Sequence, residues 1–149
     1  MNNKRNWKIV YSDYTGVQKK AIDLIYKEVG TLILRDTGRY TLHVLACENA
    51  ENAVFDKNAI IIGKYDENEH IRKYIDRSEI PENGYVVKVT ANQESSTLKT
   101  VIITALNARE VFYGAVDFVD NYLPKAELIR NKLHFYKETF DNPLPDYYN

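Results

Sequence analysis

The stretch from Thr100 to Pro124, TVIITALNAREVFYGAVDFVDNYLP, carries the clearest fold signals in the sequence. Its first part, TVIITAL, is a short apolar run rich in β-branched residues, which is typical of a buried strand. The part that follows changes to helical spacing and ends at a proline. We expect Asn107 to cap this helix and Glu110 to reach back to it, as in a capping box. A strand that leads directly into a helix predicts a sheet with a helix packed on it.

Gly114 lies in the middle of the predicted helix, where alanine would be more stable by about 1 kcal/mol. It stands beside an apolar face formed by Val111, Ala115, Phe118, Val119 and Tyr122. A role in anion binding is disfavoured, because Gly114 is far from the helix start, where anions bind. We therefore expect this glycine to let the helix backbone approach the sheet closely.

The rest of the chain extends this pattern in both directions. Residues 85–90 alternate, with Tyr85, Val87 and Val89 on one side, and predict an antiparallel hairpin with TVIITAL. Further elements are expected as follows: a strand at 6–12, a helix of about 20 residues starting at Thr15 and Gly16, strands at 40–47 and 59–63, a short helix capped by Asp66 with Ile71, Tyr74 and Ile75 facing inward, and a short strand at 133–136.

The order β-α-β-β-α-β-β-α predicts an α+β fold, a two-layer sandwich in which helices pack on a mixed β-sheet. The 149 residues suit one domain. We place this domain at residues 1–124 and expect an extended tail or linker at residues 125–149.

Composition excludes several classes of partner. The net charge is −1 and no block of like charge occurs, so neither nucleic acid nor a membrane surface is expected as a partner. No apolar run approaches the roughly 20 residues of a membrane span, and no signal peptide is recognisable. As written, the protein is expected to be cytoplasmic, although an extracellular or periplasmic protein whose leader had been removed would look the same. The single cysteine, Cys47, is expected to be a buried apolar residue at a strand end.

Motifs that carry chemistry are scarce. The turn IIIGKYDE has Lys64 after a glycine, but it lacks the second glycine and the Lys-Ser/Thr pair of a phosphate loop. His43, His70 and His134 are far apart and are expected to be surface or hydrogen-bonded core residues, since a zinc site needs three or four convergent ligands. No carboxylate pair is nominated as catalytic. We predict no catalytic residue, no cofactor and no metal in this protein.

The hairpin and the last helix together also resemble a known family. The pattern GYVVKVT…TVIITALNAREVFYGAVDFVDNYLP is similar to the small N-terminal domains of several glycoside hydrolases, among them family 67 alpha-glucuronidases and family 20 beta-hexosaminidases. The strand AIIIG matches an earlier strand of those domains that ends in glycine. The match covers roughly Ala59 to Pro124, and the first 58 residues match only by the order of their elements. The positions that carry it are Gly84-Tyr85, Ile102-Ile103, Phe112-Tyr113-Gly114, Phe118 and Leu123-Pro124.

The resemblance implies a domain that precedes a catalytic (β/α)8 barrel and packs against it. The catalytic carboxylates of those enzymes lie in the barrel, so none is carried over to this protein. The tail FDNPLPDYYN reads as the extended segment that would enter such a barrel, because its prolines hold the preceding residues out of a helix. The apolar tail residues are therefore candidates for the domain interface: Phe140, Leu144, Tyr147 and Tyr148.

Three functional hypotheses follow. The first is a non-catalytic N-terminal domain of a glycoside hydrolase, whose partner is the barrel domain of the same polypeptide. The second is a carbohydrate-binding module that uses surface tyrosines, because the sequence has 12 Tyr against 5 Phe and 1 Trp. The third is a small stand-alone enzyme or nucleotide-binding α/β protein that uses the turn IIIGKYDE.

Overall fold

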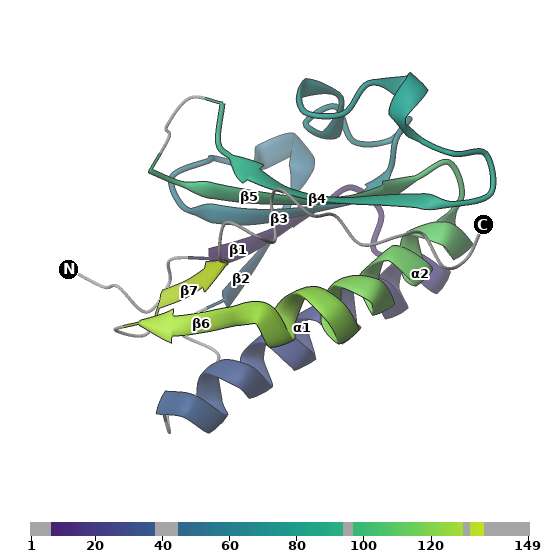
Figure 1. Ribbon diagram of the computed structural model, residues 1–149. Helices are drawn as coiled ribbons and strands as arrows, with labels where there is room; N and C mark the ends of the chain where they lie inside the picture. Colours follow the sequence, from purple (N-terminus) through teal and green to yellow (C-terminus); the bar gives the residue numbers. More distant parts are fainter. Residues whose placement is uncertain (1–6, 38–44, 94–96, 130–131, 136–149) are drawn as a thin grey trace.

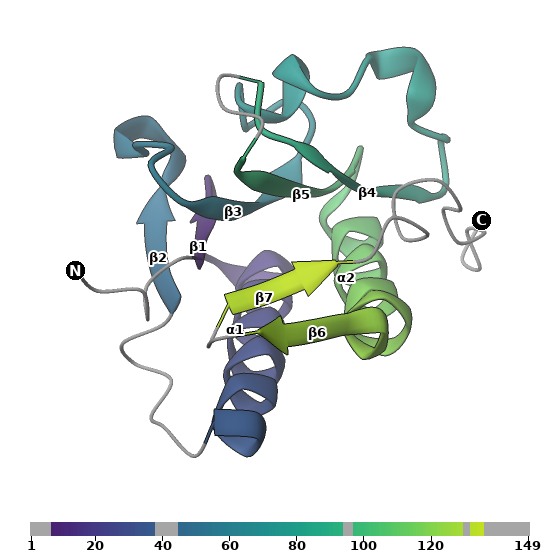
Figure 2. The same ribbon diagram turned by 60° about the vertical axis from the view of Figure 1, so that its left-hand side comes forward.

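The computed structural model describes residues 7–37, 45–93, 97–129 and 132–135 (Figure 1). Two α-helices lie on one side of a five-stranded sheet, and a separate two-stranded hairpin lies on the same side as the helices (Figures 1 and 2). The elements are β1 (Trp7–Tyr11), α1 (Gly16–Thr37), β2 (Leu45–Asn49), β3 (Asn58–Lys64), β4 (Tyr85–Ala91), β5 (Lys99–Ala105), α2 (Ala108–Asp117), β6 (Ala126–Ile129) and β7 (Lys132–Phe135).

The sheet is mixed, as predicted. Its strand order is β2-β1-β3-β5-β4, and β1 pairs in parallel with both β2 and β3. Strand β3 pairs in parallel with β5, and β4 pairs with β5 in the antiparallel direction. The predicted α+β fold, a mixed sheet with helices packed on it, is therefore confirmed.

Successive residues of the central strands face two different cores. On the helix-covered face, Trp7, Ile60 and Ile103 belong to the core beneath α1 and α2. On the other face, Val10 and Ile61 pack under the loops and short turns of residues 50–80, which we call the loop-covered face. Both faces of β3 are buried, and the strand predicted at residues 59–63 is confirmed.

Gly114 packs as its position in the sequence predicts. A Cβ atom added at this glycine would lie 3.0 Å from Cγ2 of Ile103 and 3.4 Å from Cδ1 of Tyr85. Real Cβ contacts are rarely so tight, because protein cores are already close-packed. The missing side chain therefore lets α2 press directly onto the β4–β5 hairpin.

The start of α2 differs from the predicted capping box. Asn107 occupies the N-cap position, but its side chain makes no capping hydrogen bond. The Glu110 side chain is instead buried and pairs with Arg109 at 2.8 Å. Asn107 and Glu110 therefore have the spacing of a capping box but do not form its two hydrogen bonds. At its other end, α2 continues as a π-helical turn, Phe118–Tyr122, before Pro124.

The second predicted helix is wrong as an α-helix. Residues 66–80 form two short 3-10 turns, Ile71–Lys73 and Arg77–Glu79. Asp76 caps the second turn and forms a capping box with Glu79, so the predicted cap at Asp66 is wrong as well. Asp and Ser side chains bond nearby backbone groups and so favour turns over helix interiors. The inward placement of Ile71 is nevertheless confirmed, since the residue is fully buried.

Three further expectations have different outcomes. Cys47 is exposed on the edge strand β2 and not buried, so that prediction is wrong. The short strand predicted at 133–136 is present as β7, but its antiparallel partner β6 was missed, so the segment that follows Pro124 begins as a hairpin. Within the described ranges, no helix is long and apolar enough to cross a membrane.

Candidate functional site

One hollow in the described surface lies where parallel strands end. Strand β1 leads through α1 to β2 on one side, while β3 lies on its other side and leads towards β5 and β4. Ligands of open α/β sheets bind at the carboxyl ends of strands, where the connections diverge in this way. A cavity of about 320 Å³ opens at this edge; it is lined by Ser12, Asn49, Ala50, Glu51, Glu67 and Glu69. We call it the carboxyl-edge cavity.

Gly63 brings the ends of β1 and β3 together beside this cavity. Its φ is +153°, and an added Cβ would lie 2.9 Å from Oγ of Ser12. A side chain at this position would be strained and would also displace Ser12. Among the described residues, Oγ of Ser12 and Nδ2 of Asn68 are buried without a hydrogen-bond partner. Side chains of the protein therefore already occupy the space beside Gly63, where a glycine-rich loop would hold a phosphate.

The lysine of the same turn is already paired with a carboxylate. Nζ of Lys64 lies 2.7 Å from Oε1 of Glu67, and this hydrogen bond raises the pKa of the lysine. Gln18 is buried, and its amide donates to Asp13 at 3.1 Å and to Glu67 at 3.4 Å. The remaining wall is acidic, which repels phosphate. This geometry counts against the nucleotide-binding hypothesis for IIIGKYDE.

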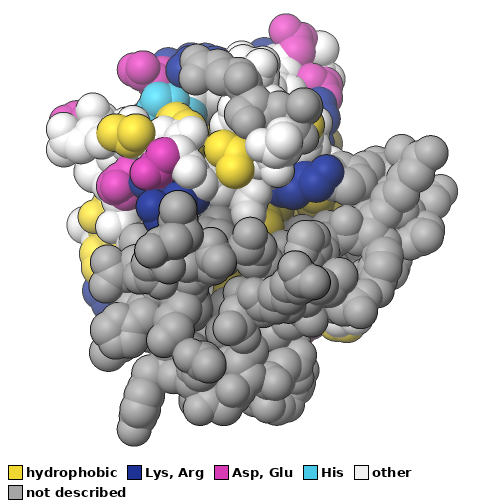
Figure 3. All heavy atoms as spheres, turned by 90° about the vertical axis from the view of Figure 1, so that its left-hand side faces the viewer, with side chains coloured by type: hydrophobic (Ala, Val, Ile, Leu, Met, Phe, Trp, Pro, Cys, Tyr) yellow, Lys and Arg dark blue, Asp and Glu magenta, His cyan; other side chains and the backbone are white. Residues whose placement is uncertain are grey.

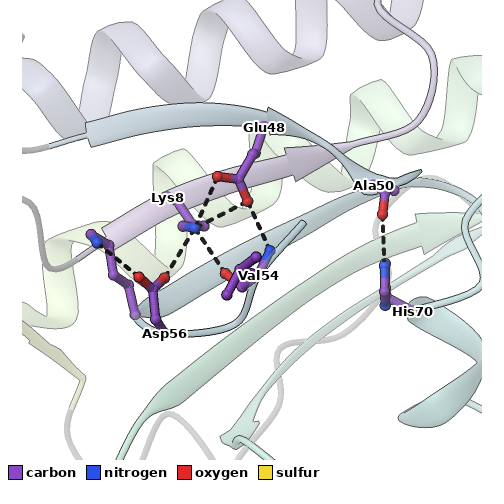
Figure 4. A network of polar contacts seen from close by, with 7 residues as sticks. Lys8, Glu48, Ala50, Val54, Asp56 and His70 are labelled. Atoms are coloured by element: carbon purple, nitrogen blue, oxygen red, sulfur yellow. Dashed lines mark hydrogen bonds and ion pairs between the residues drawn. The ribbon is translucent and has the colours of Figure 1, made fainter. Parts of the chain in front are cut away.

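A second polar cluster lies under the loop-covered face (Figure 4). Lys8 on β1 is only 3% exposed, and its Nζ donates to Glu48 at 3.0 Å, to the carbonyl of Val54 at 2.8 Å and to Asp56 at 3.1 Å. Glu48 also accepts the backbone N–H of Val54 at 3.0 Å. The hydrogen bond from Lys8 lowers the pKa of Asp56. Because every donor of the ammonium is engaged, this lysine acts as an anchor for the loop and not as a nucleophile.

His70 is a hydrogen-bonded core histidine, as expected. Its Nε2 lies 2.9 Å from the carbonyl oxygen of Ala50 (Figure 4). Its ring also packs edge-on against Phe55, with centroids 4.7 Å apart. His43 lies outside the described residues, and His134 lies in β7. No group of three or more His, Cys, Asp or Glu side chains in the described part of the protein is arranged to hold a metal ion.

The tyrosines divide into packing and surface positions. Tyr85 is buried, and its hydroxyl donates to Asp117 at 2.9 Å. Tyr14 is 43% exposed, and its hydroxyl donates to Asp23 at 2.5 Å. The ammonium of Lys19 lies over its ring, 5.1 Å from the centroid. Tyr14 is thus the best-placed tyrosine of the described surface for contact with a sugar, although part of its ring is already in contact.

Sequence reasoning missed two buried carboxylates, Glu110 and Asp117, which are seven positions apart on α2. Asp117 accepts from Tyr85 and from the amide of Asn121 at 2.8 Å, so each of its two carboxyl oxygens has a donor. Oε1 of Glu110 has no partner among the described residues. The signal that could have found them is their spacing, because both stand close to Gly114 on the side of the helix that meets the sheet.

The four candidates for the domain interface, Phe140, Leu144, Tyr147 and Tyr148, lie outside the described residues. On the described part of the face drawn in Figure 3, hydrophobic atoms form small separate patches between acidic and basic side chains. Comparison of the sequence with models of known protein families gave no match, and comparison with curated protein sequences gave none either.

Proposed function

We propose that this protein is a non-catalytic N-terminal domain of a glycoside hydrolase of the alpha-glucuronidase or hexosaminidase kind, which packs against a catalytic (β/α)8 barrel and supports it. One observation carries the proposal. Gly114 contacts Tyr85 and Ile103, and these three residues all belong to the positions that define the resemblance. A contact that joins the strand, the returning strand and the helix gives a physical reason for the whole pattern to occur together.

The arrangement also limits how such a domain would meet a barrel. Both faces of the five-stranded sheet are covered within the domain, one by α1 and α2 and the other by the loops of residues 50–80. A barrel would therefore contact helices, loops or the segment that follows β7. This is consistent with an interface built by the apolar tail residues Phe140, Leu144, Tyr147 and Tyr148.

The test compares the 149-residue protein alone with the same protein joined to the polypeptide that follows it in the gene. The domain alone is expected to leave aryl glycosides intact, and the longer protein is expected to hydrolyse them. The double change Phe140→Ser and Leu144→Ser should lower the melting temperature of the longer protein and leave that of the isolated domain unchanged. Clear turnover by the domain alone would refute the proposal.

A carbohydrate-binding module is the second candidate, and the exposure of Tyr14 favours it. Aromatic side chains with an apolar body and a polar tip suit contacts that are partly wet. Amide NMR shifts during titration with xylan and chitin fragments decide the matter. Binding through the ring predicts shifts that survive Tyr14→Phe and disappear with Tyr14→Ala. No shifts at millimolar sugar would remove this candidate.

A further inference from the structure

The turn that precedes β4 exposes an asparagine next to a glycine. Residues Pro81–Gly84 form the turn, in which Asn83 is exposed and Gly84 is followed directly by Tyr85, the first residue of β4. It is the only Asn-Gly pair in the 149 residues. We propose that Asn83 is a site of spontaneous modification, at which the side-chain amide is lost through a cyclic imide formed with Gly84.

The reaction needs no reagent except water. The backbone nitrogen of Gly84 loses its proton and attacks the amide carbon of the Asn83 side chain, so that a new C–N bond forms. The bond between that carbon and the original amide nitrogen then breaks, and the nitrogen leaves as ammonia. Water opens the resulting succinimide at either carbonyl and gives aspartate or isoaspartate. No atom is oxidised or reduced in these steps.

Local geometry favours this attack at Asn83. Glycine has no Cβ, so Gly84 places no side chain of its own against the attacking nitrogen. The N–H of Gly84 is held by the carbonyl of Pro81 at 3.4 Å, which is longer than an ordinary hydrogen bond. Asn83 is exposed, so water and base reach its side-chain amide, whereas Gly84 beside it is buried.

Asn68 supplies the contrast within the same protein. It is fully buried, it is followed by Glu69, and its side-chain oxygen accepts the backbone N–H of His70 at 3.0 Å. That hydrogen bond restrains the Asn68 side chain, and Glu69, unlike glycine, carries a side chain next to the attacking nitrogen. Asn68 is therefore expected to stay intact while Asn83 is converted.

The consequence would reach the core through Tyr85. Isoaspartate adds one carbon to the backbone and a negative charge beside Glu82, directly before β4. The ring of Tyr85 lies against Gly114 and its hydroxyl donates to Asp117 at 2.9 Å. Conversion at Asn83 should therefore lower the melting temperature of the folded protein. The fraction of modified protein would therefore increase with the age of the protein.

The test is peptide mapping of the whole protein after incubation in mildly alkaline buffer, folded and in denaturant. Trypsin releases the peptide Ser78–Lys88, in which Asn83 is the only asparagine, and the peptide Tyr65–Arg72, in which Asn68 is the only asparagine. The folded protein should gain one mass unit in Ser78–Lys88 and none in Tyr65–Arg72. An isoaspartyl methyltransferase should label the first peptide, and Asn83→Gln should abolish both signals.

Two outcomes would overturn the proposal. The first is a peptide Ser78–Lys88 that stays unmodified in the folded protein while it is converted in denaturant, since the folded turn would then protect Asn83. The second is equal conversion of Tyr65–Arg72 in the folded protein, since the exposure of the turn would then not matter. The variant Asn83→Gln keeps an amide in the turn and serves as the folded control.

Discussion

The two faces of the sheet are closed in different ways. The helix-covered face is sealed by side chains such as Phe118 and by the direct contact of Gly114 with the β4–β5 hairpin. The loop-covered face is sealed by irregular segments that polar anchors hold in place, chiefly Lys8 and His70. The difference teaches that helices bring their own backbone hydrogen bonds to a core, whereas a loop that covers a sheet needs side chains to satisfy its backbone groups.

Truncation of the helix-covered core should have the largest effect. Phe118 is fully buried, so Phe118→Ala is expected to destabilise the domain by about 3–5 kcal/mol through lost burial and a cavity. Chemical denaturation measures this change, and Phe118→Leu should cost less because it keeps more of the volume. On the loop-covered side, Val54→Ala should change little, since Val54 is 62% exposed. If Phe118→Ala and Val54→Ala lowered the free energy of unfolding equally, the buried side chain would not stabilise the domain more than the exposed loop residue, which would contradict this account.

The second-largest loss of stability is expected when a larger side chain replaces Gly114 in the contact between α2 and the sheet. Gly114→Leu is expected to lower stability by about 1–3 kcal/mol, because the side chain has no space between α2 and the hairpin. Gly114→Ala tests the same contact more finely, since alanine ordinarily stabilises a helix interior by about 1 kcal/mol. A Cβ only 3.0 Å from Ile103 should cancel that gain. An unchanged melting temperature for Gly114→Leu would show that the packing account is wrong.

Loss of the lysine anchor should affect mainly the loop-covered face. Lys8→Met removes the ammonium from Glu48 and takes the Lys8 donor away from the Val54 carbonyl, at an expected cost of about 1–3 kcal/mol. The cost stays below that of a fully buried pair, because the carboxylates of Glu48 and Asp56 are 34% and 54% exposed. Hydrogen exchange at the Val54 amide should accelerate, while exchange at Ile103 should not.

Lys57 offers a matched control for that variant. It also pairs with Asp56, at 3.3 Å, but it does not hold the Val54 carbonyl as Lys8 does, and its side chain is more exposed. Lys57→Met is therefore expected to change stability by less than about 1 kcal/mol. If both lysine variants behave alike, the loop is not held by Lys8.

The smallest effect should be the acid sensitivity of Asp56. Its pKa is lowered in the folded protein by the hydrogen bond from Lys8. A lowered folded pKa contributes stability above the unfolded pKa of about 4, and this contribution is lost as the pH falls through the folded pKa. The stability difference between the wild type and Asp56→Asn should be below about 1 kcal/mol at neutral pH and should vanish in acid. A difference that does not change with pH would contradict the pairing.

The same division explains which parts the sequence could predict. Periodic spacing indicated α1 and α2, alternation indicated the β4–β5 hairpin, and the cost of a mid-helix glycine indicated the contact at Gly114. These signals are local, since they depend on residues a few positions apart. Lys8 stands inside an apolar strand, and its partners Glu48 and Val54 lie 40 and 46 residues away, so no local pattern reveals the anchor.

Local rules also failed where tertiary packing opposed them. Glu110 has the spacing of a capping box but is buried beside Arg109 instead. Residues 66–80 have inward-facing isoleucines at helical spacing, yet the Asp76 carboxylate accepts both the backbone N–H and the hydroxyl of Ser78 in a short turn. Of the candidate site, the acidic wall of the carboxyl-edge cavity could not be predicted, because Ser12, Glu51 and Glu67 meet only after the parallel strands have paired.

The central claim is that this domain serves a catalytic barrel. The most direct measurement is the sequence of the reading frame immediately after Asn149. We expect a continuous frame that encodes alternating strands and helices of a (β/α)8 barrel, with two carboxylates at strand ends. A stop codon directly after Asn149 in the natural gene would contradict it.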